Sequence, residues 1–209
     1  LINLKNMIPE KDNQTAEKFW DNFSGKFNLL TKFSEWRWNL PKKEIFSKAS
    51  GNVIMIGAGT GNDFKSFPSD TRITAIDFSQ KMLDIAKTKT KQSPSPVELK
   101  HEDVQSLSFD DESFDSAITS CVFCSVPDPV KGLKEILRVL KPGGSLAMFE
   151  HTDSKNPFFH FFLKTMNFFP GPDLTRKTAQ NVHIAGFEIL SVNYIFQDIV
   201  KTIHARKPH

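Results

Sequence analysis

The chain has 209 residues, of which 39% are hydrophobic and 24% charged, values typical of a soluble globular protein with one substantial core. Its formal net charge is only +3, and the lysines are scattered among acids, so we do not expect nucleic acid as a partner. No segment approaches the roughly 18 uninterrupted apolar residues of a membrane span. The start of the chain is too polar for a signal peptide and there are only two cysteines, so we expect a cytoplasmic protein.

The first predicted element is a long helix from Thr15 to Lys48, because aromatic residues and leucines recur there at spacings of three and four. These apolar positions are Phe19, Trp20, Phe23, Phe27, Leu30, Phe33, Trp36 and Leu40. We interpret the region of about residues 10–48 as an N-terminal helical cap.

An apolar run, Val53–Ile56, ends abruptly in the glycine pattern Gly57-Ala58-Gly59-Thr60-Gly61. Such a junction of strand and turn lets a ligand approach the backbone where a Cβ would collide with it. A second apolar run, residues 72–77, ends in Asp77, and an acid at this distance accepts hydrogen bonds from ribose hydroxyls in nucleotide-binding folds. A plain tight turn would explain the glycines but not the acid. The spacing is tighter than the dinucleotide pattern G-x-G-x-x-G and Asp63 follows it, so we expect an adenosine ligand without phosphates.

The next part of the chain alternates predicted helices and strands. These elements are a short helix at residues 63–67, the strand 72–77, a helix from the N-cap Ser79 to Lys91, the strand 97–101, a strand within 113–120, a helix from Asp128 to Lys141, a Pro-Gly-Gly turn and the strand 145–150. The alternation predicts an α/β fold with a doubly wound parallel sheet. Ligands of such sheets bind beyond the carboxyl ends of the strands. One cleft is therefore expected where predicted strands end, at Gly57, Asp77, Asp103, Cys121 and His151.

From residue 152 to about 180 the pattern changes. The segment Pro157–Pro170 is short and rich in phenylalanine, and we interpret residues 152–180 as a lid inserted over the cleft. The segment would cover a hydrophobic acceptor and touch a membrane surface peripherally. Asp173 is a candidate cap for a further helix through His183, and alternation near residues 188–194 and 198–205 predicts two final strands.

Several segments resemble the motifs of class I S-adenosylmethionine-dependent methyltransferases of the methyltransferase domain 11 type. Besides the glycine turn, they are Ile76-Asp77-Phe78-Ser79-Gln80-Lys81-Met82-Leu83, Glu102-Asp103-Val104 with Leu107, Phe109 and Ser113-Phe114-Asp115, and Leu133 to Gly144, which contains E-x-x-R-V-L-K-P-G-G. They cover about Gly51 to His151 in the family's order. The resemblance implies one methyltransferase domain over residues 1–209, with a mostly parallel, seven-stranded Rossmann-like sheet that ends in an antiparallel hairpin.

The resemblance also implies S-adenosylmethionine as the cofactor and S-adenosylhomocysteine as its product. Asp77 is expected to bind the ribose, Met82 to pack on the adenine and Asp103 to accept a hydrogen bond from the adenine amino group. The implied cofactor-binding residues are Phe19, Ile56, Gly57, Ala58, Gly59, Gly61, Asp77, Phe78, Met82, Asp103, Val104 and Cys121. Core packing is an equal alternative for the aromatic residues that would close over the cofactor, which are Phe19, Phe23 and Phe27.

Two residues are candidates for a role in catalysis. His151 follows a predicted strand and is placed to orient an acceptor or take its proton, and Cys124 is expected in the acceptor pocket. The pattern Cys121-Val122-Phe123-Cys124 has C-x-x-C spacing, but a zinc site needs more ligands and a redox pair usually opens a helix. We therefore expect no metal and interpret both thiols as residues that line the pocket. For His160 we favour a structural role.

The acceptor class follows from segments that together resemble two groups of this superfamily. The segments are residues 124–126, 149–151, 174–176 and 185–187. One group comprises bacterial phosphatidylethanolamine N-methyltransferases and quinone C-methyltransferases, and the other methylates small alkyl thiols. Both imply a small or lipid-like hydrophobic acceptor. A cofactor-binding module without turnover is a further hypothesis, whereas the missing N/D-P-P-Y/F motif argues against the common methyltransferases of base amino groups.

Overall fold

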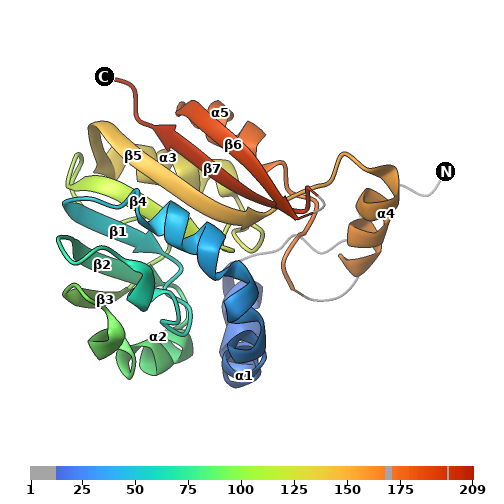
Figure 1. Ribbon diagram of the computed structural model, residues 1–209, viewed down its shortest axis with the longest axis horizontal. Coiled ribbons are helices and arrows are strands. Elements are labelled where there is room, and N and C mark those ends of the chain that lie inside the picture. The colour runs from blue at the N-terminus through green and yellow to red at the C-terminus, as the bar shows by residue number, and fades with distance from the viewer. Residues whose placement is uncertain (1–12, 168–170, 197) are drawn as a thin grey trace.

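A seven-stranded sheet forms the centre of the protein, which we describe from a computed structural model over residues 13–167, 171–196 and 198–209 (Figure 1). The strand order is β3-β2-β1-β4-β5-β7-β6. The strands are β1 (Asn52–Ile56), β2 (Arg72–Asp77), β3 (Val97–His101), β4 (Phe114–Ser120), β5 (Leu140–His151), β6 (Glu188–Phe196) and β7 (Val200–Arg206). Strands β1 to β5 are parallel, and β7 runs antiparallel to β5 and β6. The predicted parallel sheet with a terminal antiparallel hairpin is confirmed.

The direction in which the sheet grows reverses at β1. The chain adds β2 and then β3 on one side of β1, and β4 pairs with β1 on the other side. The loops that follow β1 and β4 therefore leave the sheet in opposite directions and open a crevice between them. This reversal places the glycine turn and the residues after β4 beside each other.

Helices cover both faces of the sheet, because side chains of each buried strand alternate between two cores. One core contains Ile54 and Ile56 of β1 with residues of α3 (Pro129–Val139) and α5 (Thr178–Ile184). The other contains Val53 and Met55 with residues of α2 (Gln80–Lys87) and the end of α1 (Asn13–Phe46). The predicted N-caps are present: Ser79 Oγ accepts from Met82 N at 3.2 Å, and Asp128 Oδ1 accepts from Lys131 N at 2.9 Å.

Several element bounds differ from the predictions. Strand β5 begins at Leu140 and therefore includes the Pro-Gly-Gly segment. Its pairing with β4 shifts register there, between Phe114 and Ser116 of β4. Helix α2 ends at Lys87 and a separate 3-10 turn follows at Thr90–Gln92. The prediction that Asp173 caps a helix is wrong, because α5 begins after Lys177 and Asp173 instead accepts hydrogen bonds within its own loop.

Helix α1 lies across the carboxyl ends of the strands and bends along its length (Figure 1). It contains Pro41, which removes a backbone donor and bends helices. Near its end, the Trp38 ring makes edge contacts with Phe149 of β5 and Phe196 of β6, with centroids 5.8 and 6.1 Å apart. At its beginning, Asp21 Oδ1 accepts from Ser79 Oγ at 2.6 Å. The helix is thus fixed to both halves of the sheet. The side chain of Phe27, a predicted aromatic residue of this helix, lies outside the described residues.

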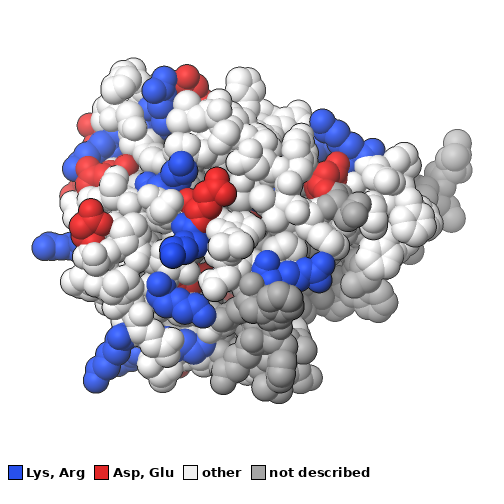
Figure 2. All heavy atoms as spheres, in the orientation of Figure 1, with Lys and Arg blue, Asp and Glu red and all other residues white. Residues whose placement is uncertain are grey.

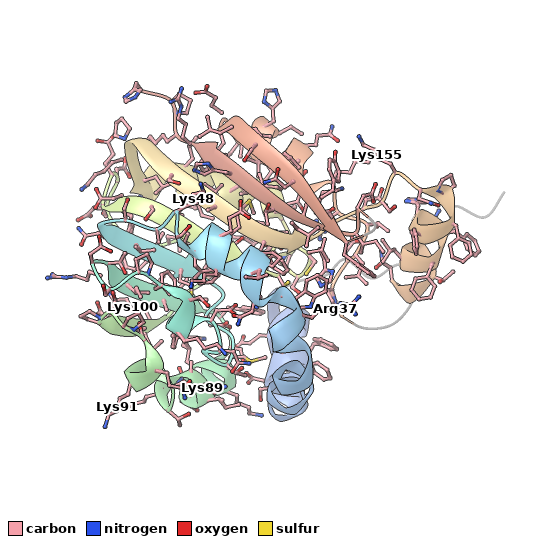
Figure 3. The ribbon with its side chains drawn as sticks, in the orientation of Figure 1. Arg37, Lys48, Lys89, Lys91, Lys100 and Lys155 are labelled. Atoms are coloured by element: carbon pink, nitrogen blue, oxygen red, sulfur yellow. The ribbon has the colours of Figure 1, made fainter. Side chains whose placement is uncertain are left out.

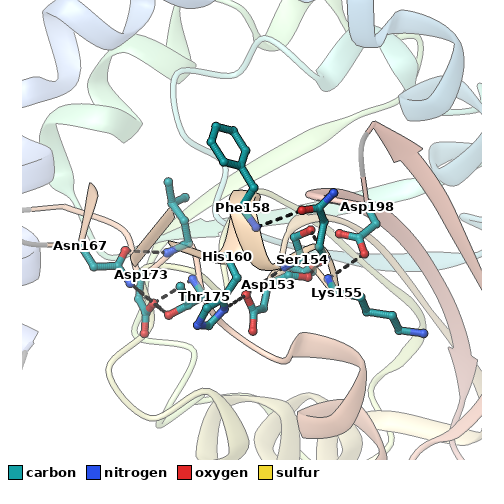
Figure 4. Close-up of polar contacts among 12 residues, drawn as sticks. Asp153, Ser154, Lys155, Phe158, His160, Asn167, Asp173, Thr175 and Asp198 are labelled. Atoms are coloured by element: carbon teal, nitrogen blue, oxygen red, sulfur yellow. Dashed lines mark hydrogen bonds and ion pairs between the residues drawn. The ribbon is translucent and has the colours of Figure 1, made fainter. Parts of the chain in front are cut away.

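Helix α4 (Pro157–Met166) stands apart from the sheet at one end of the molecule (Figure 1). Its Leu163 side chain is buried, whereas Phe158, Phe161 and Phe162 are 73, 68 and 53% exposed. Asn167, after its last turn, accepts from Leu174 N and donates to the Asp173 carboxylate and the Thr175 hydroxyl, which ties the helix to the loop that follows (Figure 4). Among the described residues, no helix is long and apolar enough to cross a membrane.

Candidate functional site

A cleft of about 580 Å³ opens at the carboxyl ends of β1, β2, β4 and β5, and this size suits a small-molecule ligand. Its walls bring together residues far apart in sequence, from Phe19 in α1 to Leu174 after α4. All predicted cofactor-binding residues except Gly61 line it, and so do the predicted catalytic residues His151 and Cys124. The five residues at predicted strand ends, Gly57, Asp77, Asp103, Cys121 and His151, thus line the same cleft.

The three glycines of the turn have positive φ but different surroundings. A Cβ on Gly57 would stand 2.4 Å from Val122 Cγ2, and one on Gly61 would stand 2.8 Å from the Phe64 ring and 3.0 Å from Ala86 Cα. A Cβ on Gly59 would have no atom within 4 Å. Only Gly59 therefore opens backbone toward a ligand, whereas Gly57 and Gly61 allow close packing inside the protein.

The Asp77 carboxylate lies at the floor of the cleft and is 7% exposed. Its Oδ2 accepts from Gly59 N at 2.8 Å and its Oδ1 accepts from Ser79 N at 2.9 Å. Burial raises the pKa of Asp77 to about 6, against the lowering effect of these two hydrogen bonds. Each oxygen retains a lone pair for a further donor, so the geometry suits a diol that donates two hydrogen bonds.

Asp103 also faces the cleft, and its orientation is fixed from behind. Its Oδ1 accepts from Gln105 N at 2.9 Å, and Gln105 Oε1 in turn accepts from Asp128 N at the start of α3. Val104 and Met82 are buried beside it. This end of the cleft therefore combines apolar surface with one oriented acid, as an adenine ring with an exocyclic amine requires.

The turn after β4 forms the opposite wall. Cys121 adopts φ of 58°, which is unfavourable for a residue with a Cβ, and its N–H donates to Phe149 O at 2.7 Å. The fully buried Glu150 carboxylate holds this turn: it accepts from Val122 N at 3.0 Å, from Phe123 N at 3.1 Å and from Thr119 Oγ1 at 2.6 Å. Burial raises the pKa of Glu150 to about 7.

The thiols in this turn are poor nucleophiles. Burial, followed by the negative charge of Glu150, raises the pKa of Cys121 well above its usual range and that of Cys124 to about 12. Within the described part of the chain, no three His, Cys, Asp or Glu side chains are grouped to hold a metal ion. The cysteines contribute apolar lining to the cleft and do not offer a reactive thiolate.

His151 lines the cleft directly after Glu150. Burial, and then the positive charge of Lys42, lower the pKa of His151, so its ring is neutral at pH 7 and can accept a proton. His160 instead pairs through Nδ1 with Asp153 Oδ1 at 2.7 Å at the base of α4 (Figure 4). The structural interpretation of His160 agrees with this contact.

Only the last part of the predicted lid, residues 152–180, reaches the cleft among the residues that the structure describes. Among the described residues, none of α4 contributes to the cleft wall, whereas Pro172 and Leu174 in the loop after it do. Asp173 N donates to Cys124 O at 2.6 Å and fixes this loop against the turn after β4. Helix α4 is therefore tied to the rim of the cleft through its following loop.

Sequence reasoning missed several residues of the site. In the sequence, Glu150 belongs only to the predicted strand 145–150 and to the segment 149–151, although an acid at the end of an otherwise apolar run is a signal of a buried polar role. Lys42, Thr60 and Trp38 also line the cleft. Lys42 stands next to Lys43 in a helical sequence, and only the fold shows which of the two lysines faces inward.

These features fit the adenosine and amino-acid parts of the cofactor that the sequence implies. Gly59 leaves open backbone beside the Asp77 carboxylate, and the Thr60 hydroxyl is buried at the cleft without a hydrogen-bond partner among the described residues. An unpaired buried hydroxyl is costly, so a ligand that bonds to it would remove a penalty. Gly59, Asp77, Met82 and Asp103 are the residues that would hold the cofactor.

We predict that Glu150 makes stability decrease as pH rises. The folded protein retains the Glu150 proton up to about pH 7, whereas the unfolded chain releases it near pH 4.5, so the free energy of unfolding falls between these values. A shift of this size corresponds to roughly 3 kcal/mol. Glu150→Gln keeps an oxygen for Val122 and Phe123 and donates to Thr119, but does not titrate. In urea unfolding, wild type should lose stability relative to Glu150→Gln from pH 5 to 8; a constant difference would contradict the assignment.

Known proteins that are similar to this chain are methyltransferases. Residues 54–148 match the methyltransferase domain family. A demethylmenaquinone methyltransferase of Staphylococcus saprophyticus is 31% identical over 159 residues, which cover 71% of this chain and 67% of the relative. A ubiquinone/menaquinone biosynthesis C-methyltransferase of a Geobacter species is 33% identical over 150 residues, 66% of this chain and 64% of the relative. A methyltransferase structure from Thermotoga maritima superposes with a TM-score of 0.68 at 21% identity, over 92% of this chain and 99% of that one.

The matched domain begins in β1 and ends in β5, so it contains the glycine turn, Asp77, Asp103 and the turn after β4. These parts form the cleft. The Staphylococcus saprophyticus relative, 31% identical over 67% of its length, shows the family. The chain belongs to the class I S-adenosylmethionine-dependent methyltransferases.

Proposed function

We propose that the protein transfers the methyl group of S-adenosylmethionine to a small hydrophobic acceptor of quinone type. The observation that carries this proposal is the apolar part of the cleft lining. It is formed by the aromatic and apolar side chains of Trp38, Phe149, Val126, Pro172 and Leu174. The neutral His151 also belongs to this lining. Such a lining favours an apolar ring over a charged or strongly polar acceptor.

The relatives support the same acceptor class. Both relatives described above carry a quinone in their names, and one is named a C-methyltransferase. A quinone-type ring is flat and apolar with a few polar oxygens, which suits aromatic walls and a single uncharged imidazole. S-Methylation of a small thiol is the alternative that an acceptor assay separates.

Methyl transfer depends more on the positioning of the two reactants than on a covalent intermediate with the protein. Bound S-adenosylmethionine supplies an electrophilic methyl group on a sulfonium. The chain's own residues hold the reactants in line and exclude water: Asp77 and Asp103 fix one side, and the Glu150-bound turn fixes the other. His151 accepts the proton that the acceptor loses, because its ring lines the cleft and is neutral.

A panel of acceptors with methyl-labelled cofactor tests the proposal. We expect transfer to reduced quinone-type rings with an apolar tail, and little transfer to small polar amines or acids. Transfer only to small thiols would replace the proposed acceptor class, and binding of the cofactor without transfer to any acceptor would favour a module without turnover.

The role of His151 is tested by His151→Gln, which keeps the size and polarity of the side chain but is not basic. We expect kcat on the best acceptor to fall by about 10²-fold, with little change in the Kd of S-adenosylhomocysteine. The exposed His183 on α5 provides the control His183→Gln, which should leave both values unchanged. Unchanged kcat in His151→Gln would exclude proton transfer to this ring.

We also infer that the protein meets its acceptor at an anionic membrane surface, through residues 157–170 and the side chains beside them. On α4, Phe158, Phe161 and Phe162 are spaced so that they share one exposed face. Residues 155–172 include two lysines, Lys155 and Lys164, and no acid. An exposed apolar helix face with flanking lysines favours the boundary of a bilayer with negative headgroups.

The charges near α4 support this inference. Lys155 lies beside α4 (Figure 3), and its Nζ is 5.6 Å from the ring centre of the exposed Tyr194. Arg37 lies above the Phe196 ring at 4.8 Å, at the end of the same hairpin. Lysines and arginines are interspersed with acids on the displayed face (Figure 2), and beside α4 the Asp198 carboxylate accepts from Lys155 N at 2.8 Å. Cations thus accompany exposed aromatic rings near α4, an arrangement typical of membrane interfaces.

Vesicle binding tests the membrane inference. Replacement of both Phe161 and Phe162 by Ser should weaken co-sedimentation with vesicles of phosphatidylcholine and phosphatidylglycerol by at least about tenfold, because two exposed rings lose their apolar contact. Ile184→Ser, at a 54% exposed position on α5, is the matched control and should bind like wild type. Equal binding of all three proteins, or no binding by wild type, would overturn the inference.

A further inference from the structure

A short segment between α4 and α5, residues 171–176, runs along the wall of the cleft, and we call it the strap. At its beginning it lies against α1, because a Cβ on Gly171 would stand 3.3 Å from the ring of Phe19. Further along, the side chains of Pro172 and Leu174 line the cleft. The strap therefore belongs to the same wall as the aromatic residues at the start of α1.

Polar contacts, and not the hydrophobic cores, hold the strap in place. All six of its residues are described by the structure and half-buried, and none of them is part of either core. Asp173 N donates to Cys124 O at 2.6 Å, and the Arg176 guanidinium donates to Val126 O at 3.1 Å. Asp153 N donates to Arg176 O at 2.9 Å. A segment without core packing opens at a low free energy, so these contacts decide where the strap lies.

One carboxylate gathers the side-chain contacts of the strap. Asp173 Oδ1 accepts from Thr175 N at 3.0 Å, from Thr175 Oγ1 at 2.7 Å and from Asn167 Nδ2 at 2.7 Å (Figure 4). Its Oδ2 lies 3.1 Å from Arg176 Nε. Burial alone would raise the pKa of Asp173, but the hydrogen bonds from Thr175, the charge of Arg176 and the bond from Asn167 hold this pKa below its usual range. The carboxylate is therefore ionised at neutral pH.

Leu174 lies between the residues that this carboxylate holds. Its N–H donates to Asn167 Oδ1 at 3.1 Å, so the amide of Asn167 binds both Leu174 and the Asp173 carboxylate. The Leu174 side chain lines the cleft, whereas the Asp173 side chain does not. The direction of one cleft-lining side chain thus depends on a carboxylate that stands outside the cleft.

We propose that Leu174 limits the size of the acceptor ring that the cleft takes, and that Asp173 is a positioning residue that acts through Leu174. This role of Leu174 rests on the proposed function, because Leu174 belongs to the apolar lining that receives the acceptor. It adds the side chain that selects among acceptors of one class by their size. Since the Leu174 side chain narrows the cleft, its removal shifts the preference of the enzyme toward a larger ring.

Transfer from methyl-labelled S-adenosylmethionine to reduced benzoquinone and reduced naphthoquinone tests the size limit, because the two probes differ by one fused ring. Leu174→Ala should shift the ratio of their kcat/KM values toward the two-ring probe by about tenfold, since the one-ring probe loses apolar contact. Leu174→Phe should shift the ratio the other way. The control Leu190→Ala, at a 45% exposed position on β6, should leave it unchanged.

The positioning role of Asp173 is tested by Asp173→Asn, which keeps the size of the side chain but loses the charge opposite Arg176. The KM of the one-ring probe should rise severalfold, with kcat and the Kd of S-adenosylhomocysteine near those of wild type. In the Leu174→Ala background, Asp173→Asn should have no further effect on this KM, because Asp173 acts through the Leu174 side chain. Asp70→Asn, at an exposed position before β2, is the matched control.

The outcomes separate the strap from the function. An unchanged ratio in the folded Leu174 variants would exclude the size limit while the proposed function stands. Additive effects of Asp173→Asn and Leu174→Ala, or an equal loss of S-adenosylhomocysteine affinity in Asp173→Asn, would show a structural role of Asp173 alone and overturn its positioning role.

A second pair of probes keeps the test independent of the acceptor atom. If wild type methylates only thiols, thiophenol and naphthalenethiol replace the two reduced quinones, and the same shifts in the ratio are expected. Transfer to none of the four probes would overturn the proposed function and the acceptor role of Leu174 together.

Discussion

The buried carboxylate of Glu150 fixes the geometry on which the cleft depends. It is the residue before the end of β5 and accepts hydrogen bonds from Thr119 of β4 and from two residues of the turn after it, so it joins two strands at the edge where the cleft opens. This bonding keeps Cys121 in an unfavourable backbone conformation and places Val122 directly against Gly57. The glycine at position 57 is thus required by the protein's own packing, and the distance between the two walls of the cleft follows from it.

Helix α1 completes the cleft from the other side. It reaches both halves of the sheet, through Asp21 on Ser79 at one end and Trp38 on Phe149 and Phe196 at the other. Its aromatic side chains and Lys42 form a wall that the parallel sheet alone does not supply. The helix therefore supplies aromatic surface and one positive charge to the cleft.

The sequence was sufficient for features whose cause is local. Gly59 and Asp77 lie at the ends of short apolar strands, so strand periodicity and turn chemistry placed them correctly at one edge of the sheet. Glu150 and Lys42 were missed because their partners lie far along the chain, and a buried acid looks like any other acid in one sequence. The position of α4 was also beyond the sequence, since its phenylalanines predicted a lid over the cleft, whereas no described residue of α4 lines the cleft and three of its rings are exposed. The start of β5 differs because strand pairing with Phe114 extends it through the glycines.

We propose that one cleft, formed by the glycine turn, Asp77, Asp103 and the turn after β4, binds the cofactor. Hydrogen exchange with and without S-adenosylhomocysteine measures this directly, because amides that a ligand orders or covers exchange more slowly. We predict that protection appears in residues 57–63, 77–82, 103–105 and 121–125, and that β6 and α4 exchange as before. Binding without protection of the glycine turn and the residues after β2, or protection confined to α4 and the terminal hairpin, would contradict the account.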